Sequence, residues 1–187
     1  FKGIVFDLDG TLIDSPLCFA SIRKQLGIPE GEYILEYLAQ LPDEVRAPKA
    51  RELEKIELRA ATQASLFPGV AEWIDELYAA GTHLGIFTRN CRTATEHVVR
   101  SLGLKMGMVV TRDDAPPKPD PAGLHRFLEC WGMSPTELLY VGDFRFDIEC
   151  GKKAGVKTAL FTNGQTPTET WGADFLIHEY PGLDLNQ

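Results

Sequence analysis

Short apolar runs alternate along this chain with segments whose apolar residues recur at helical spacing. The first run, Ile4-Val5-Phe6, lacks polar alternation and is rich in β-branched and aromatic residues, which is typical of a strand buried on both faces. Similar runs, bounded by turn residues, predict further strands at 82–88, 108–110, 138–141 and 158–161, with a short one at 174–177.

Helical patterns separate these strands. Residues 70–80 place Trp73, Ile74 and Leu77 on one face and close at Gly81. Comparable segments end near 102, cover 122–131 and begin near 147. Strands that alternate with helices in this way predict a mostly parallel sheet covered on both faces. We therefore expect a doubly wound α/β fold.

Residues 15–66 interrupt the alternation, because they show helical patterns and little strand signal. Ser15-Pro16 predicts the start of a helix, and Gly27 predicts its end. Two further helices are expected at 33–41 and 48–66, joined by the segment 41–48.

These segments predict two units. Residues 1–14 and 67–187 would form an α/β core domain, and residues 15–66 would form a small α-helical cap inserted after the first strand.

The composition of the chain argues against some classes of partner. The 187 residues are 44% hydrophobic and 25% charged, which suits a globular protein with one full core. With 27 acidic against 19 basic residues, the net charge of −8 argues against a nucleic-acid surface. No apolar run approaches the roughly 20 residues that span a bilayer, so we expect no membrane partner. The oligomeric state is left open.

The four cysteines are widely scattered and form no CxxC pair: they are Cys18, Cys91, Cys130 and Cys150. This spacing indicates free thiols rather than a disulfide framework or a zinc site. Free thiols suit a reducing compartment, so we expect a cytoplasmic protein.

Reactive side chains stand where the predicted strands end. Asp7 and Asp9 follow the first strand, and residues two apart on an extended backbone point to the same side. Two carboxylates so close repel each other, so they need a cation, a shared proton or different roles. The alternative is a solvated turn, since Asp9-Gly10 is a common turn dipeptide.

Later segments supply partners for this pair. Thr88 ends the second long strand, and Asp143 ends a later one. The ends of parallel strands meet at one edge of a sheet. Lys118 lies in a loop stiffened by four prolines, which follows a strand and can reach that edge.

This combination resembles the haloacid dehalogenase-like (HAD) hydrolase superfamily, in particular its phosphoglycolate-phosphatase-like members with a helical cap. The motifs are Asp7-Leu8-Asp9-Gly10-Thr11, Thr88 after an apolar strand, Lys118-Pro119, and Gly142-Asp143 followed by Asp147. The resemblance covers essentially the whole chain and implies a Rossmann-like core.

The resemblance implies the following roles. Asp7 would attack phosphorus and form an aspartyl-phosphate, and Asp9 would act as general acid and then base. Thr88 and Lys118 would contact the phosphoryl group. Mg²⁺ would be held by Asp7, Asp9 through its carbonyl, and Asp143, with Asp147 supporting the metal shell or anchoring Lys118. The substrate contacts would be Gly10, Arg89 and Asn90.

The implied activity is Mg²⁺-dependent hydrolysis of a small phosphorylated metabolite. The alternatives are a phosphomutase similar to the β-phosphoglucomutases and a catalytically idle binding subunit. Three features depart from the usual family pattern: Arg89 stands where Asn is common, Phe144 and Phe146 stand where small or polar residues are commoner, and the cap is short. Because these positions line the leaving-group side, they bear on the substrate.

The charged residues of the cap favour a solvated helix face. Arg46, Lys49, Arg51 and Arg59 lie there near Glu52, Glu54 and Glu57. The alternative is that these cations contact a substrate anion.

Overall fold

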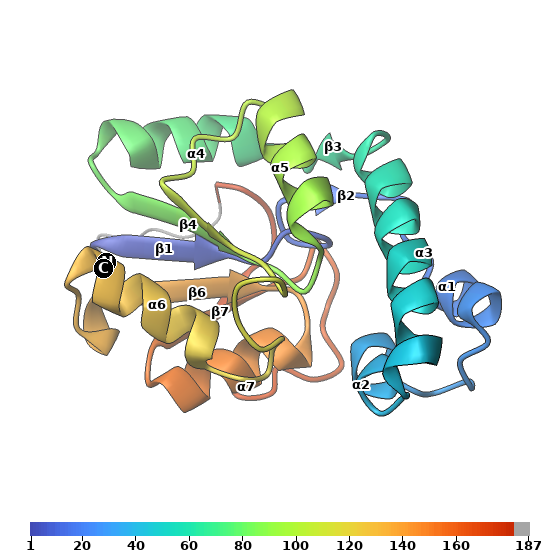
Figure 1. Ribbon diagram of the computed structural model, residues 1–187. Coiled ribbons are helices and arrows are strands. Elements are labelled where there is room, and N and C mark those ends of the chain that lie inside the picture. The colour runs from blue at the N-terminus through green and yellow to red at the C-terminus, as the bar shows by residue number, and fades with distance from the viewer. Residues whose placement is uncertain (182–187) are drawn as a thin grey trace.

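A six-stranded parallel sheet forms the centre of the computed structural model, which describes residues 1–181 (Figure 1). Its strand order is β5-β4-β1-β6-β7-β8, and every neighbouring pair is parallel. The strands are β1 (Gly3–Phe6), β4 (His83–Phe87), β5 (Met108–Val110), β6 (Leu138–Gly142), β7 (Lys157–Phe161) and β8 (Phe175–Ile177). The predicted α/β fold with a mostly parallel sheet is confirmed.

Two helices cover each face of the sheet (Figure 1). Helices α4 (Val70–Ala79) and α5 (Arg92–Ser101) lie on one face, and α6 (Ala122–Trp131) and α7 (Arg145–Ala154) lie on the other, with the 3₁₀ turn η1 (Pro135–Glu137) before β6. Strand β1 serves both layers, because Ile4 and Phe6 pack with Trp73 of α4 while Val5 packs with Phe127 of α6. All three β1 side chains are fully buried, as a central parallel strand requires.

The other three helices stand apart from the sheet, beyond the carboxyl ends of β1 and β6 (Figure 1). They are α1 (Phe19–Leu26), α2 (Ile34–Ala39) and α3 (Asp43–Ala61), and we call them the three-helix segment. They share an apolar cluster of their own, formed by Ile22, Leu26, Ile28, Leu38 and Leu53.

The chain enters and leaves the three-helix segment through one small antiparallel ribbon. Strand β2 (Ile13–Asp14) pairs with β3 (Ser65–Leu66), with Asp14 opposite Ser65. The sequence predicted that residues 62–66 form the end of a helix, and this prediction was wrong. Helix α3 ends at Ala61, and pairing with β2 places Ser65 and Leu66 in a strand.

Two other helix boundaries were predicted wrongly. Helix α1 begins at Phe19 rather than at Ser15-Pro16, because the Ser15 hydroxyl donates to Asp9 Oδ1 (2.7 Å) instead of capping a helix. Helix α3 begins at Asp43 rather than at Pro48. Pro42 precedes the helix with φ −55°, and Pro48 is tolerated in the second turn, where it removes one backbone hydrogen bond.

The cysteines are unpaired, as the sequence predicted, with Cys91 and Cys150 buried and Cys18 and Cys130 exposed. Within residues 1–181, no helix has the length and apolar character needed to cross a membrane. Residues 182–187, the end of the predicted core domain, lie outside the described residues.

Gly85 tests the packing between β4 and α6. A Cβ at this position would collide with the Phe127 ring and approach the Met108 carbonyl oxygen to 3.1 Å. We expect Gly85→Ala to lower the free energy of unfolding by about 1–3 kcal/mol through overpacking. Gly107→Ala is the control, because its Cβ would meet only the Leu84 carbonyl, at 3.6 Å. Equal urea midpoints for both variants would contradict this close packing.

Candidate active site

The ends of three neighbouring strands bring the predicted reactive residues together. Asp7 directly follows β1, and its N–H donates to the Val141 carbonyl (2.8 Å), which continues the pairing with β6. Thr88 follows β4 in the same way, with its N–H on the Val110 carbonyl (3.1 Å). Asp143 follows the last residue of β6. The strand register therefore fixes the backbone of all three residues.

Lys118 reaches these strand ends from the proline-rich loop and is only 2% exposed. Its ammonium donates to Asp7 Oδ1 (2.6 Å) and to Asp147 Oδ1 (2.7 Å). Burial disfavours the charge of Lys118, but Asp147 and Asp7 outweigh burial and raise the pKa of the lysine. Lys118 is therefore a fixed cation among the carboxylates.

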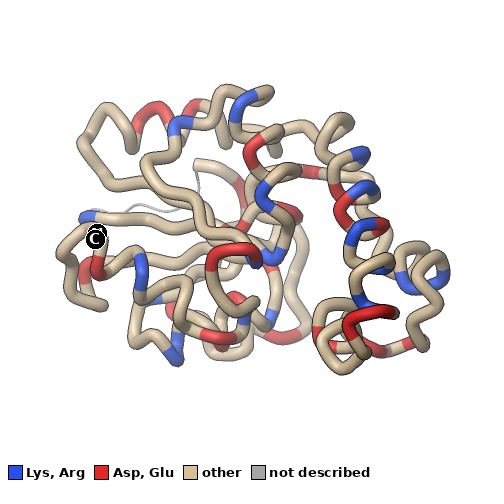
Figure 2. Tube along the Cα trace, viewed as in Figure 1, with Lys and Arg blue, Asp and Glu red and all other residues tan. Residues whose placement is uncertain are grey.

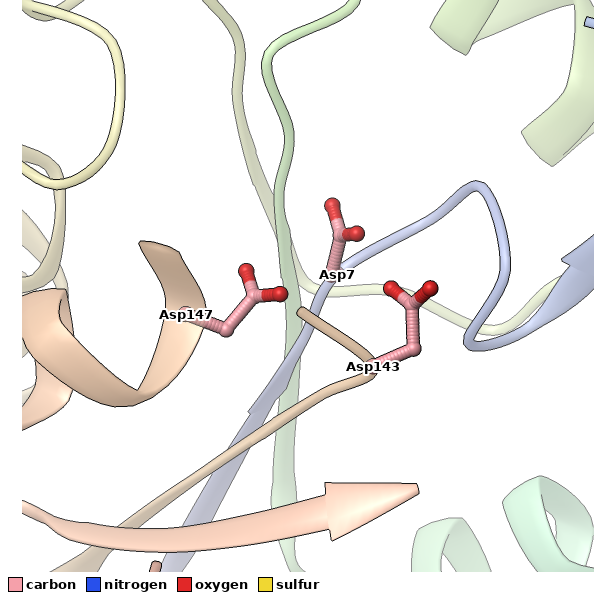
Figure 3. A group of neighbouring side chains, drawn as sticks. All are labelled: Asp7, Asp143 and Asp147. Carbon is pink, nitrogen blue, oxygen red and sulfur yellow. The ribbon is translucent and has the colours of Figure 1, made fainter. Parts of the chain in front are cut away.

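Three carboxylates lie close together at these strand ends (Figure 3). Asp7, Asp143 and Asp147 each offer an oxygen, and these oxygens lie within 4.8 Å of one another. Burial raises the pKa of Asp7 well above its ordinary value, against the opposing effect of Lys118. Burial and the charge of Asp147 raise the pKa of Asp143 to about 7. Three hard oxygen donors fit a divalent metal ion.

The loop after β1 positions Asp143. Gly10 has φ +82°, and a Cβ there would collide with the Asp143 carboxylate. The Thr11 hydroxyl donates to Asp143 Oδ1 (3.3 Å). Gly10, predicted as a substrate contact, thus lies against a carboxylate, and its missing side chain allows that close approach.

Asp9 has different partners from Asp7. Ser15 Oγ donates to its Oδ1 (2.7 Å), and Asn90 Nδ2 donates to its Oδ2 (3.0 Å). Burial raises the pKa of Asp9, although both hydrogen bonds oppose the shift. Asn90, also predicted as a substrate contact, is therefore engaged with Asp9.

Asp147 is held on both of its oxygens. Oδ1 accepts from Lys118 and from the Tyr140 hydroxyl (2.9 Å), and Oδ2 accepts from the Phe144 N–H (3.0 Å). These contacts fix Asp147 as the second anchor of Lys118.

Sequence reasoning did not assign Thr11, Ser15 and Tyr140, which orient the carboxylates. Thr11 could have been found from its place inside the first motif. Ser15 was interpreted as a helix cap, and Tyr140 matched the apolar pattern of a buried strand. Neither of these two residues carries a local signal for its contact.

The chain is similar to known proteins. The profile of the haloacid dehalogenase-like hydrolases matches residues 4–161. An uncharacterized hydrolase from Saccharomyces cerevisiae is 31% identical over 169 residues, which cover 87% of this chain and 78% of the yeast protein. A phosphoglycolate phosphatase from Aquifex aeolicus is 30% identical over 194 residues, which cover 93% of this chain and 91% of that enzyme. The crystal structure of a hydrolase from Pseudomonas syringae has the same fold, with a TM-score of 0.80 at 22% identity over 98% of this chain and 96% of that one.

The chain belongs to the haloacid dehalogenase-like hydrolases. These matches confirm two predictions from the sequence: the family, and the class of enzyme, a hydrolase of the phosphatase type.

The hydrolase has a cavity of about 380 Å³ between the carboxylates and the three-helix segment. Asp7, Asp9, Thr88 and Lys118 line its floor, together with Asp143 and Asp147. The six predicted catalytic and metal-binding residues therefore face one space.

Arg89 connects the floor of the cavity to α2. Its guanidinium donates to Glu36 Oε2 (2.7 Å) and to the Lys118 carbonyl. The guanidinium also lies 4.9 Å from the centre of the Phe146 ring. Arg89, predicted as a substrate contact, lines the cavity, and its charge is paired with Glu36 of α2.

Helix α3 carries charges of both signs along its length (Figure 2), but Glu57 is not part of a solvated face. Its side chain is buried and accepts two hydrogen bonds from Arg112, at 2.6 and 2.8 Å. Arg112 belongs to the loop after β5 and also donates to the Arg89 carbonyl (3.0 Å). The prediction for Glu57 was wrong because its partner is distant in sequence.

The Glu57–Arg112 pair tests how the helices are held on the hydrolase core. Arg112→Met leaves Glu57 buried without a partner, so we expect the free energy of unfolding to fall by about 3 kcal/mol. The double variant with Glu57→Gln should recover part of this loss. Arg59→Met is the control, since Arg59 is 66% exposed and meets Glu52 only at 3.7 Å. If urea unfolding showed the same loss of free energy of unfolding for Arg112→Met and Arg59→Met, this would contradict a buried, stabilising pair.

Proposed function

We propose that this hydrolase is a Mg²⁺-dependent phosphatase that acts on a small phosphomonoester through an aspartyl-phosphate on Asp7, with residues 15–66 as its cap. One observation carries the proposal. Lys118 fixes Asp7 through Oδ1, and within residues 1–181 no donor contacts Oδ2. This oxygen is therefore available to attack a phosphoryl group in the cavity.

The two aspartates of the first motif divide the chemistry between them. Asp7 attacks phosphorus, the new bond to its carboxylate forms, and the bond to the leaving oxygen breaks. Asp9 gives that oxygen a proton, for which its raised pKa is suited. Asp9 then takes a proton from water as the water attacks phosphorus, which releases phosphate and restores Asp7.

Two other residues stabilise the charge that develops on the phosphoryl group. Thr88 donates its hydroxyl to a phosphoryl oxygen, and Lys118 supplies a positive charge without solvent reorganisation, because it is already buried.

The metal ligands we propose are the carboxylates of Asp7 and Asp143 and the main-chain carbonyl of Asp9. Asp147 borders this shell and anchors Lys118. Bound Mg²⁺ would neutralise phosphoryl charge and orient the group for in-line attack.

The relative from Aquifex aeolicus is named for phosphoglycolate, which makes this compound the first metabolite to test. The free thiols support a reducing compartment, so we also propose that the enzyme is cytoplasmic.

Phosphate release from p-nitrophenyl phosphate tests the mechanism. We expect release with Mg²⁺, loss of release with EDTA, and loss of at least about a thousandfold in Asp7→Asn, because the attacking carboxylate is gone. Folding of the variant is checked by circular dichroism. A folded, Mg²⁺-binding enzyme that releases no phosphate would refute the proposal.

Asp143→Asn tests the metal site separately. Replacing one charged ligand weakens Mg²⁺ binding, so the Mg²⁺ concentration for half-maximal activity should rise by about tenfold or more. Asp75→Asn serves as control, because Asp75 is exposed and pairs with Lys105 away from the cavity. An unchanged Mg²⁺ requirement in Asp143→Asn would remove Asp143 from the metal site.

A further inference from the structure

Much of the cavity lining beyond the carboxylates is apolar. The three-helix segment contributes Phe19, Tyr33, Leu35 and Leu53, and the core contributes Phe144 and Phe146. A group esterified to a phosphate at Asp7 would meet these side chains within the cavity.

Three of these four aromatic side chains are exposed. Phe19 is 58% exposed, Tyr33 37% and Phe144 41%. They are three of the eight large apolar side chains that are exposed among residues 1–181, and all three line the same cavity. Exposed apolar side chains that gather at one concave place mark a binding surface more often than single ones do.

The aromatic wall is already ordered. The Phe146 ring lies 4.7 Å from the Tyr33 ring and 5.3 Å from the Phe144 ring, measured between centroids. The guanidinium groups of Arg89 and Arg145 lie 4.9 and 5.1 Å from the Phe146 centroid. Phe146 is therefore fixed from several sides, and it holds the two exposed rings apart from each other across the boundary between helices and core.

Most charges that line the wall are already paired. Arg89 pairs with Glu36, and Glu57 pairs with Arg112. Arg23 is the exception, since it lines the cavity and forms no ion pair within the described part of the chain. A small acidic substrate would use Arg23, whereas an apolar one would use the rings.

The size of the cavity favours the rings. An apolar cavity of about 150 Å³ is enough to hold benzene. The cavity of about 380 Å³ therefore has room for a phosphoryl group and a ring together. A two-carbon acid would leave most of the apolar wall in contact with water, which is unfavourable.

We propose that the preferred substrate is a phosphomonoester whose leaving group carries an aromatic or ring-sized apolar body, bound against the rings of Tyr33, Phe144 and Phe146. This inference rests on the proposed phosphatase activity and names its substrate class.

Three alkyl phosphates test the inference: 2-phenylethyl phosphate, ethyl phosphate and 2-phosphoglycolate. The first two are primary alkyl esters that differ by a ring, so their ratio of kcat/KM reports binding of the ring rather than leaving-group reactivity. We expect kcat/KM for 2-phenylethyl phosphate to be about tenfold or more above kcat/KM for ethyl phosphate. It should also be above kcat/KM for 2-phosphoglycolate. Tyr33→Ala should lower the first ratio by about fivefold, because it removes one side of the ring site.

Tyr78→Ala is the matched control, since Tyr78 is 59% exposed on α4 and does not line the cavity. Its ratio should equal that of the native enzyme. Preference for 2-phosphoglycolate, abolished in Arg23→Gln, would overturn the inference while the phosphatase proposal stands. A ratio near one for the two alkyl esters would overturn it as well. No release from any ester, including p-nitrophenyl phosphate, would instead refute the phosphatase proposal itself.

Discussion

The active site depends on one buried cation. Several carboxylates share a volume from which water is largely removed, and like charges in such a place raise one another's pKa. The ammonium of Lys118 lies between Asp7 and Asp147 and offsets part of this repulsion. Its backbone comes from a loop with four prolines, so the position of the cation is set by chain stiffness as well as by charge. The strand ends and this loop therefore have to be correctly placed relative to each other for the site to form.

A second constraint separates two aspartates that lie only two residues apart. Asp7 contacts the lysine, whereas Asp9 accepts from neutral donors, Ser15 and Asn90. An ammonium favours the ionised form of a carboxylate more strongly than a hydroxyl or an amide does. Burial raises the pKa of both carboxyl groups, so the two aspartates differ in the groups that hold them: a cation holds Asp7, and neutral donors hold Asp9.

The sequence predicted the parts of the molecule that have local causes. Strand β5 and helix α6 were predicted with their observed bounds, because apolar runs and turn residues determine both. The convergence of Asp7, Thr88 and Asp143 followed from parallel topology alone. The helices of residues 15–66 were less predictable, since contacts distant in sequence decide where they end: Ser65 pairs with Asp14 across the ribbon. Glu57 was misplaced for the same reason, because its surroundings are set by Arg112.

The ribbon of β2 and β3 has a consequence for how this architecture can change. Asp14 and Ser65 face each other, so the fifty residues between them leave the core and return to it at one point. The free-energy cost of closing such a loop, which is entropic, grows slowly, by only about 0.6 kcal/mol for each doubling of loop length. The core can therefore keep its carboxylates in place while the inserted helices lengthen, shorten or are replaced. Substrate range and chemistry can in this way diverge independently in evolution.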